Sequence, residues 1–297
     1  GDMYLGYVSP SVPSLMPPGV WDKIAPMGAE LEAFAKAGEA AVREAGRYLK
    51  ANLGGAVEAS YKGAVDLVTP FDLGAQEILV GRLSAAFPSH GFLAEEGLSR
   101  AGDSGCRWII DPLDGTTNFA HGFPVFSVSA ALERDGRLAL GFVHDPVRDE
   151  MFRAEAGRGA FLDGSPIRVS RVPDLGKALL ATGFPYDVRT SAVNNLCHWE
   201  RFIVRAQAIR RCGSAALDLS YVACGRFDGF WELKLKPWDV AAGALMVAEA
   251  GGRVTDFEGG PFALDAPGLV ATNGLIHPAM LEVLARAGRQ GGNDVRS

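Results

Sequence analysis

Acidic residues gather at three places in this sequence where an apolar stretch ends. They are Glu95-Glu96, the two aspartates of Asp111-Pro112-Leu113-Asp114, and Asp239 after Pro237-Trp238. Functional side chains in α/β proteins commonly lie where strands end. One such acidic pair is ordinarily a solvated turn. Three together predict a site built from carboxylates.

The segment from Asp111 to Asn118 has the composition of an anion-binding turn. We expect Pro112 to end the preceding strand and Gly115-Thr116-Thr117-Asn118 to open a helix. Unpaired amide groups at a helix start can bind phosphate, but carboxylates beside them would repel it unless cations intervene. The sequence therefore predicts metal ions bound next to a phosphate.

Oxygen ligands alone favour Mg²⁺, which takes one or two carboxylates and keeps water or phosphate oxygens in its other positions. A zinc site is not indicated, because the five histidines show no H-x-x-x-H spacing and the four cysteines form no C-x-x-C pair. The wide separation of the cysteines favours buried free thiols over a disulfide framework.

Apolar periodicity predicts the elements that position these groups. A helix runs from Gly28 to about Gly54, and Gly38 on its apolar face marks a close packing contact. Asp135-Gly136 and Asp163-Gly164 predict antiparallel hairpins between residues 125 and 169. The other expected strands are 57–61, 91–94, 108–110, 178–182, 208–212 and 227–231, and the other expected helices are 71–87, 191–204, 215–224 and 238–250.

Composition excludes several classes of protein. The 297 residues are 48% hydrophobic and 22% charged, which is typical of a folded globular protein and excludes disordered or collagen-like chains. A net charge of −6 argues against a nucleic-acid surface built on diffuse positive charge. No apolar run is long enough to span a membrane. Residues 1–26 lack the features of a secretory signal, so we expect a cytoplasmic location.

Several motifs together resemble the signatures of the inositol monophosphatase family. One signature is similar to Asp111-Pro-Leu-Asp-Gly-Thr-Thr-Asn-Phe119, which follows Trp108-Ile-Ile110. The other signature is similar to Trp238-Asp-Val-Ala-Ala-Gly243, which is followed by Glu249-Ala-Gly-Gly252. Asp66-Leu-Val-Thr69 with Asp72, and Glu95-Glu96-Gly97, are similar to that family's remaining active-site segments. Order and spacing agree from roughly Glu30 to Leu284, so the resemblance covers nearly the whole chain.

This resemblance implies an α/β (α+β type) fold, a layered α/β/α/β/α sandwich of the inositol monophosphatase and fructose bisphosphatase kind. We expect residues 1–27 to be an extended N-terminal segment and 28–168 an N-terminal α+β half with most metal ligands. Residues 169–290 would form a C-terminal α/β half with Asp239 and the substrate contacts, and 291–297 a polar tail.

The same resemblance implies Mg²⁺-dependent hydrolysis of a phosphate monoester by a metal-activated water. Each active site would hold two or three Mg²⁺ ions, for which Mn²⁺ could substitute. Glu95, Asp111 and the Leu113 backbone carbonyl would hold one ion. Asp111, Asp114 and Asp239 would hold a second. Two metal ions can stabilise both sides of an in-line displacement at phosphorus, so no side-chain nucleophile is required.

Further roles follow from the resemblance alone. Asp72 and Thr116, with Glu95, would orient or deprotonate the attacking water, while Glu96 and Lys62 would support the site. The residues implied to contact substrate are Asp114, Gly115, Thr116 and Thr117 around the phosphate, Gly213, Ser214, Ala215 and Glu232 around the alcohol, and also Asp239.

The substrate implied first is inositol 1-phosphate, because Thr117-Asn118-Phe119 resembles the inositol monophosphatase branch, whereas the nucleotide-directed branch carries Lys-Glu-Phe. Fructose 1,6-bisphosphate, histidinol phosphate and 3′-phosphoadenosine 5′-phosphate are alternative substrates of the same chemistry. A non-catalytic regulatory relative, or one that binds RNA or polymerase, is the alternative of a different class. The complete set of carboxylates argues for catalysis. A homodimer is also implied by the family.

Some of these residues have ordinary structural interpretations as well. Asp66 would cap the turn or helix that follows, and Thr69 would hydrogen-bond locally within it. Lys62, beside Gly63, is equally well interpreted as a solvated loop residue. A buried carboxylate at Glu232 would be costly without a partner, so we expect a substrate hydroxyl or a cation beside it.

Lithium sensitivity is the first testable expectation from the resemblance. Hydrolysis of a phosphate monoester should be inhibited by millimolar lithium at low Mg²⁺, with sodium at equal ionic strength as the control. Initial rates measured against lithium concentration check this. Full activity in lithium would contradict close kinship with the lithium-sensitive enzymes.

Overall fold

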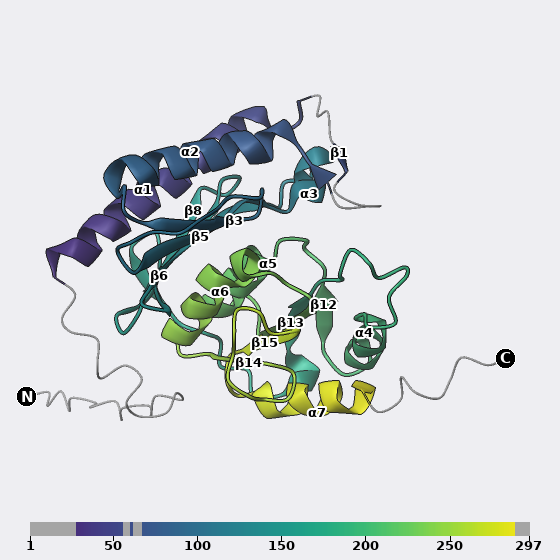
Figure 1. Ribbon diagram of the computed structural model, residues 1–297. Helices are drawn as coiled ribbons and strands as arrows, with labels where there is room; N and C mark the ends of the chain where they lie inside the picture. Colours follow the sequence, from purple (N-terminus) through teal and green to yellow (C-terminus); the bar gives the residue numbers. More distant parts are fainter. Residues whose placement is uncertain (1–27, 56–59, 62–66, 289–297) are drawn as a thin grey trace, which may run out of the picture.

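The structure is a computed structural model that describes residues 28–55, 60–61 and 67–288. Its helices and strands stack in five layers (Figure 1). Helices α1 (Ala29–Asn52) and α2 (Pro70–Ala86) cover one face of an eight-stranded sheet. Helices α5 (Ala215–Ala223) and α6 (Pro237–Glu249) lie between this sheet and a five-stranded sheet. Helices α4 (Leu196–Ile203) and α7 (His277–Gly288) cover the outer face of the second sheet.

The eight-stranded sheet has the order β10-β9-β8-β7-β6-β5-β3-β4, and only the β3–β5 pair is parallel. Its strands are β3 (Gly91–Ala94), β4 (Ser99–Arg100), β5 (Cys106–Asp114), β6 (Ser127–Arg134), β7 (Arg137–Asp145), β8 (Glu150–Glu155), β9 (Gly159–Leu162) and β10 (Ser165–Ile167). The helix α3 (Thr116–Ala120) follows β5 directly, and β1 (Ser60–Tyr61) pairs with β2 (Leu67–Val68) in a separate ladder.

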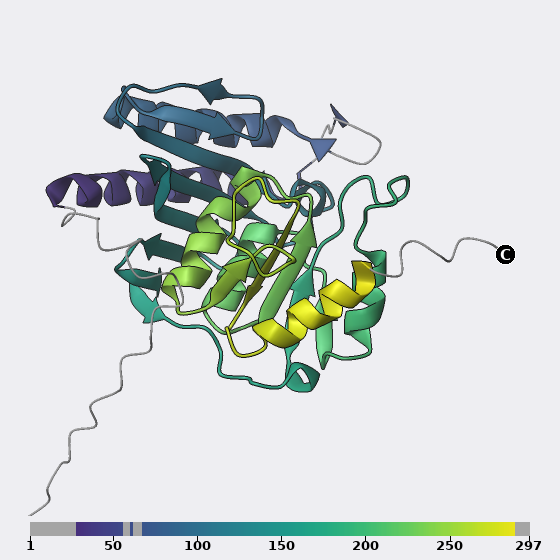
Figure 2. The ribbon, with the colours of Figure 1, turned by 60° about the horizontal axis from the view of Figure 1, so that its bottom comes forward.

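The five-stranded sheet has the order β12-β11-β13-β15-β14 and is mixed, as Figure 2 shows from another side. β11 is parallel to both β12 and β13, and β15 is antiparallel to both of its neighbours. Its strands are β11 (Leu179–Thr182), β12 (Ala208–Arg210), β13 (Gly229–Leu233), β14 (Arg253–Thr255) and β15 (Gly268–Thr272), and a 3₁₀ turn, η1 (Leu175–Lys177), precedes β11.

Buried apolar side chains fill the four spaces between the five layers. Trp108 and Phe142 pack beneath α1 and α2, and the apolar residues of α5 and α6 pack between the two sheets. Trp231 packs with Phe202 of α4 on the outer side. The layered α/β/α/β/α architecture expected from the sequence is therefore confirmed. The division of the chain into residues 28–168 and 169–290 stays a prediction.

Two expectations about the elements are wrong in detail. Pro112 does not end its strand, because β5 continues to Asp114 with a shift of register between Asp111 and Asp114 that accommodates a residue without an N–H group. The helix expected from residue 191 begins at Leu196. The buried Asn195 side chain before it bonds Thr182 Oγ1 and Gly183 O, which holds the preceding residues as a loop.

The cysteines are all free, as expected, but Cys106 is the buried one and Cys197 is exposed. Both predicted hairpin turns are confirmed, since Asp135 and Asp163 take positive φ values of 50° and 48°, each followed by a glycine. Of the strand expected at 57–61, residues 57–59 lie outside the described residues, as does Asp66. Within the described ranges, no helix is long and apolar enough to cross a membrane.

Gly38 gives a prediction about stability. A Cβ atom there would lie 2.7 Å from Phe142 and 3.0 Å from Trp108, which confirms the expected close contact between α1 and the sheet. Because both rings are buried, Gly38→Ala should destabilise the protein by about 1–3 kcal/mol in urea unfolding. Gly81→Ala is the matched control: it faces open space in α2 and should stabilise by about 0.5–1 kcal/mol. Equal effects of the two substitutions would contradict this packing account.

Candidate active site

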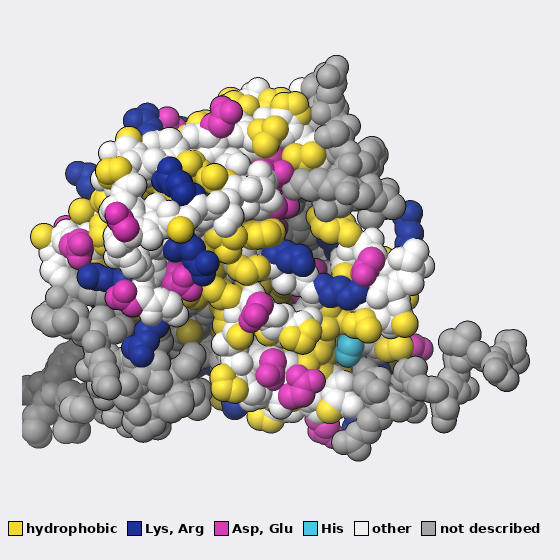
Figure 3. Space-filling model, viewed as in Figure 1, with side chains coloured by type: hydrophobic (Ala, Val, Ile, Leu, Met, Phe, Trp, Pro, Cys, Tyr) yellow, Lys and Arg dark blue, Asp and Glu magenta, His cyan; other side chains and the backbone are white. Residues whose placement is uncertain are grey.

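A pocket of about 520 Å³ lies where the ends of β3, β5, β11 and β13 meet the beginnings of α3, α5 and α6. The predicted site residues that line it are Glu95, Asp111, Leu113, Asp114, Gly115, Thr116, Thr117, Gly213, Ser214, Ala215, Glu232 and Asp239. Segments more than a hundred residues apart in the sequence thus contribute to one polar cavity. Acidic and basic side chains alternate on the face of the molecule drawn in Figure 3, without a continuous basic surface among its described residues.

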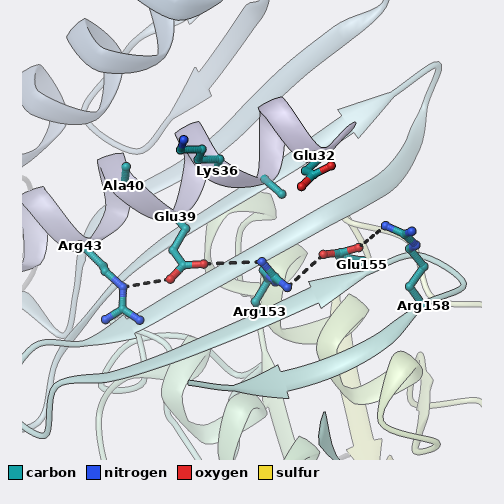
Figure 4. A pocket seen from close by; sticks show the side chains of 9 residues that line it. Glu32, Lys36, Glu39, Ala40, Arg43, Arg153, Glu155 and Arg158 are labelled. Atoms are coloured by element: carbon teal, nitrogen blue, oxygen red, sulfur yellow. Dashed lines mark hydrogen bonds and ion pairs between the residues drawn. The ribbon is translucent and has the colours of Figure 1, made fainter. Parts of the chain in front are cut away.

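A larger pocket of about 700 Å³ lies elsewhere, between α1 and β8. Figure 4 shows that its charged side chains form a chain of ion pairs, in which Glu39 contacts Arg43 and Arg153, and Glu155 contacts Arg153 and Arg158. The carboxylates of Glu39 and Glu155 therefore already have cationic partners within the protein. None of the sequence-predicted site residues lies there, so the smaller pocket is the candidate site.

Asp114 is held by the start of α5. Its Oδ2 accepts hydrogen bonds from Ser214 Oγ at 2.6 Å and from the Ala216 amide at 2.8 Å, and its Oδ1 accepts a weaker one from the Ala215 amide at 3.3 Å. The helix start favours the negative charge, yet burial outweighs this and raises the pKa of Asp114.

Asp111 and Asp239 lie in the same acidic group. Asp111 Oδ1 accepts a hydrogen bond from the Leu113 amide at 3.0 Å, and Asp239 Oδ2 accepts one from the Lys236 amide at 2.6 Å at the start of α6. Burial raises the pKa of both well above the usual value, and repulsion from Glu95 and Asp114 raises each further. Four acidic groups from three segments of the chain, β5, the turn after β3 and the start of α6, therefore repel one another in one pocket.

Asp72 and Thr116 form a connected pair beside these acids. Asp72 is fully buried at the third position of α2, where its Oδ2 accepts from the Thr69 amide at 2.8 Å and from Thr69 Oγ1 at 2.5 Å. The Thr116 hydroxyl lies 2.9 Å from Asp72 Oδ1 and 3.0 Å from the Leu113 carbonyl. Burial raises the pKa of Asp72. Thr69 bonds within its own turn, as expected.

Two glycines allow neighbouring segments of the chain to approach closely near the turn after β5. Gly115 has φ +103°, and a Cβ atom on it would lie 3.1 Å from the Val125 carbonyl and 3.2 Å from the Gly213 carbonyl. Gly213 also has a positive φ, +87°. Asn118 joins the two segments, because its Nδ2 donates to the carbonyls of Val125 and Cys212. The turn after β5 and the approach to α5 are therefore fixed against each other.

Glu232 closes the side of the pocket formed by the second sheet. Its carboxyl group lies against the backbone of Gly183, where any Cβ atom would overlap it. Burial raises the pKa of Glu232 to about 8, although Arg211 opposes the shift. Such a group needs a hydrogen-bond donor, in agreement with the partner expected from the sequence.

Two predicted site residues do not line the pocket, and a third cannot be placed relative to it. Asp72 lies behind Thr116, Glu96 is half-buried in the turn next to Glu95, and Lys62 lies outside the described residues. Sequence reasoning missed Arg211, Asp218 and the loop from Thr182 to Asp187, which do line it. A lone acid in the apolar helix 215–223 was a signal for Asp218, whereas the loop gave none.

The donor set fits hard divalent cations, since Glu95, Asp111, Asp114 and Asp239 offer only oxygen and share a buried place where their charges repel. As the described side chains lie, no three His, Cys, Asp or Glu converge on one point that would hold a metal ion. The carboxylates of Asp114 and Asp239 instead accept hydrogen bonds from the starts of α5 and α6.

Comparisons with known proteins agree with the fold. The model of the family described as "Inositol monophosphatase family" matches residues 30–291. An inositol-1-monophosphatase of Rhizobium meliloti is 44% identical over 86% of this chain and 94% of its own. The Nus factor SuhB of Escherichia coli K12 is 43% identical over 81% of this chain and 91% of its own. The solved inositol monophosphatase of Anabaena (Nostoc) sp. PCC 7120 superposes with a TM-score of 0.79 at 39% identity, covering 86% and 97% of the two chains.

The raised pKa values predict how stability depends on pH. Without divalent cations, the folded protein keeps a proton on Glu232, whose pKa burial raises to about 8, that the unfolded chain has released at neutral pH. The raised pKa values of Asp111 and Asp239 act in the same direction. The folded state binds more protons, so the free energy of unfolding should fall as pH rises. In EDTA we expect a fall of roughly 1 kcal/mol per pH unit between about pH 7 and 8.5, above the range in which unfolded histidines titrate.

Urea unfolding at several pH values measures this slope. Saturating Mg²⁺ should remove most of it, because bound cations keep the carboxylates ionised, and Asp111→Asn should reduce it in EDTA. An unfolding free energy that rises with pH in EDTA would contradict the electrostatic description of the pocket.

Proposed function

The chain belongs to the inositol monophosphatase family, as its sequence motifs indicated, and from this premise we propose that it hydrolyses phosphate monoesters with Mg²⁺, with inositol 1-phosphate as its substrate. The observation that carries the proposal is the buried group of Glu95, Asp111, Asp114 and Asp239 beside the turn after β5. Without cations this pocket repels a phosphate, whereas with cations it attracts one.

Bound metal ions would supply positive charge against the phosphoryl oxygens and the leaving oxygen. Their ligands would be Glu95, Asp111, the Leu113 carbonyl, Asp114 and Asp239. The chain's own contribution to binding phosphate lies in the turn after β5. Gly115 lets the backbone approach closely, and the Thr116 and Thr117 residues at the start of α3 face the pocket. The phosphate is thereby oriented beside the acidic group.

Asp72 and Thr116 are suited to receive a proton from the attacking water. The Thr116 hydroxyl faces the pocket, and Asp72 accepts its proton from behind at 2.9 Å. Burial raises the pKa of Asp72, so its carboxylate is a better proton acceptor than an exposed one. Asp72 therefore acts through Thr116, and the water reaches the hydroxyl without contacting Asp72.

The names of some relatives support a second candidate function for this chain. The similar proteins called Nus factor SuhB are as close in sequence as the inositol-1-monophosphatases, so a role as a Nus factor is compatible with this chain. The two functions separate experimentally, because a variant without metal ligands would lose hydrolysis and keep a function carried by the folded surface. The expected homodimer stays a prediction.

An initial-rate panel tests the proposed function. Four substrates are each assayed with Mg²⁺ and with EDTA. They are inositol 1-phosphate, fructose 1,6-bisphosphate, histidinol phosphate and 3′-phosphoadenosine 5′-phosphate. We expect Mg²⁺-dependent release of phosphate, with the highest kcat/KM for inositol 1-phosphate. No hydrolysis of any of the four would contradict the proposal.

Asp114→Asn should remove most of the activity, by about a hundredfold or more in kcat, because it deletes a charge that holds cations beside the phosphate. Asp135→Asn is the control: Asp135 is exposed in a hairpin turn, where asparagine also accepts a positive φ. Both variants should keep the circular dichroism spectrum of the parent. Hydrolysis by Asp114→Asn at the parent rate would show that the site is wrongly assigned.

A further inference from the structure

Asp218 is a buried acid in the pocket wall to which the preceding mechanism gives no role. It lies one turn into α5, and its amide donates to the Ser214 carbonyl at 3.0 Å. Its side chain is 1% exposed and lines the pocket. Among the described residues, its Oδ1 has no hydrogen-bond partner.

The position of this acid is unusual for its helix. Every residue of α5 from Ala215 to Ala223 is buried, and Asp218 is its one charged residue. The Cys212 thiol and the Asp218 carboxyl group influence each other's pKa. The carboxyl group still has an unused acceptor. Buried acceptors in folded proteins almost always have a partner, so a donor must come from the pocket.

The start of α5 fixes where Asp218 lies. Asp114 accepts hydrogen bonds from Ser214 Oγ and from the Ala216 amide, which anchors the first turn of the helix to the end of β5. Asp218 follows on the next turn of the same helix. Its place relative to the proposed phosphate site is therefore set by the backbone, which suits a residue that selects a ligand.

Asp218 and Glu232 face the same pocket from different elements, α5 and β13. The Arg211 guanidinium acts electrostatically on both carboxyl groups. Lys234, at the rim, is engaged with Asp187 at 2.6 Å and with Ser191 at 2.9 Å. Carboxyl oxygens accept hydrogen bonds from hydroxyl groups, whereas a second phosphate dianion has no proton to donate to them. This side of the pocket therefore matches a polyhydroxy group.

We propose that the Asp218 carboxyl group accepts a hydrogen bond from a hydroxyl group on the alcohol part of the substrate, alongside Glu232. Asp218 is then a specificity-determining residue for the alcohol part of the substrate. This inference rests on the proposed phosphatase function and adds to it a residue and a selection rule.

The test compares two substrates in the full-length protein with Mg²⁺. Inositol 1-phosphate carries hydroxyl groups on its alcohol part, and 4-nitrophenyl phosphate carries none. Asp218→Leu removes the acceptor at similar size, and Asp218→Asn keeps one carbonyl oxygen. Ser220→Ala is the control, because this buried residue of the same helix bonds the Ala216 carbonyl and does not line the pocket.

We expect Asp218→Leu to lower kcat/KM for inositol 1-phosphate at least about tenfold more than for 4-nitrophenyl phosphate, mainly through KM. Asp218→Asn should fall between Asp218→Leu and the parent, and Ser220→Ala should keep the parent's ratio of the two kcat/KM values. Thermal unfolding midpoints show whether each variant is folded. If Asp218→Leu fails to fold, the ratio of the two kcat/KM values in Asp218→Asn tests the inference instead.

An unchanged ratio in a folded variant, or equal losses on both substrates, would overturn the inference and leave Asp218 as a structural residue. If the parent hydrolyses neither substrate, the proposed function fails first, and this inference fails with it. The two failures are therefore distinguishable.

Discussion

Mutual repulsion among buried carboxylates is the constraint on which the rest of this structure depends. Asp111 and Asp114 lie on β5, Glu95 follows β3, and Asp239 lies on α6. Burial raises the pKa of each of the three aspartates. Such a group destabilises the fold that holds it unless positive charge is supplied. Five packed layers bring the ends of both sheets together at this one pocket, and their apolar contacts offset the repulsion. The modest net charge of −6 thus conceals a strongly acidic interior.

The same carboxylates have alternative partners within the protein. Asp114 accepts hydrogen bonds from Ser214 and the first amides of α5, and Asp239 accepts one from the amide before α6. These helix starts offset part of the cost of burying a negative charge. They also compete with a bound cation for the same oxygens.

Local patterns predicted much of this molecule, and tertiary contacts account for the rest. The periodicity of apolar residues predicted the long helices, and the Asp-Gly dipeptides predicted the hairpins. Acidic residues after apolar stretches predicted the position of the pocket. The course of β5 through Pro112 depends on its neighbour β6 and could not be predicted locally. The loop before α4 is held by the buried Asn195, whose partners lie on two other elements. Asp218 escaped attention because its apolar helix looked like ordinary core, although an acid there was a usable signal.

Counting bound Mn²⁺ by electron paramagnetic resonance tests the central claim most directly, since Mn²⁺ prefers the same oxygen ligands as Mg²⁺ and is detected without any substrate. An acidic pocket that acts as a cation site predicts at least two Mn²⁺ ions per chain, displaced by excess Mg²⁺. It also predicts weaker binding in Asp111→Asn, because Asp111 lies next to both Glu95 and Asp114. No bound Mn²⁺, or the same binding curve after that substitution, would contradict the account.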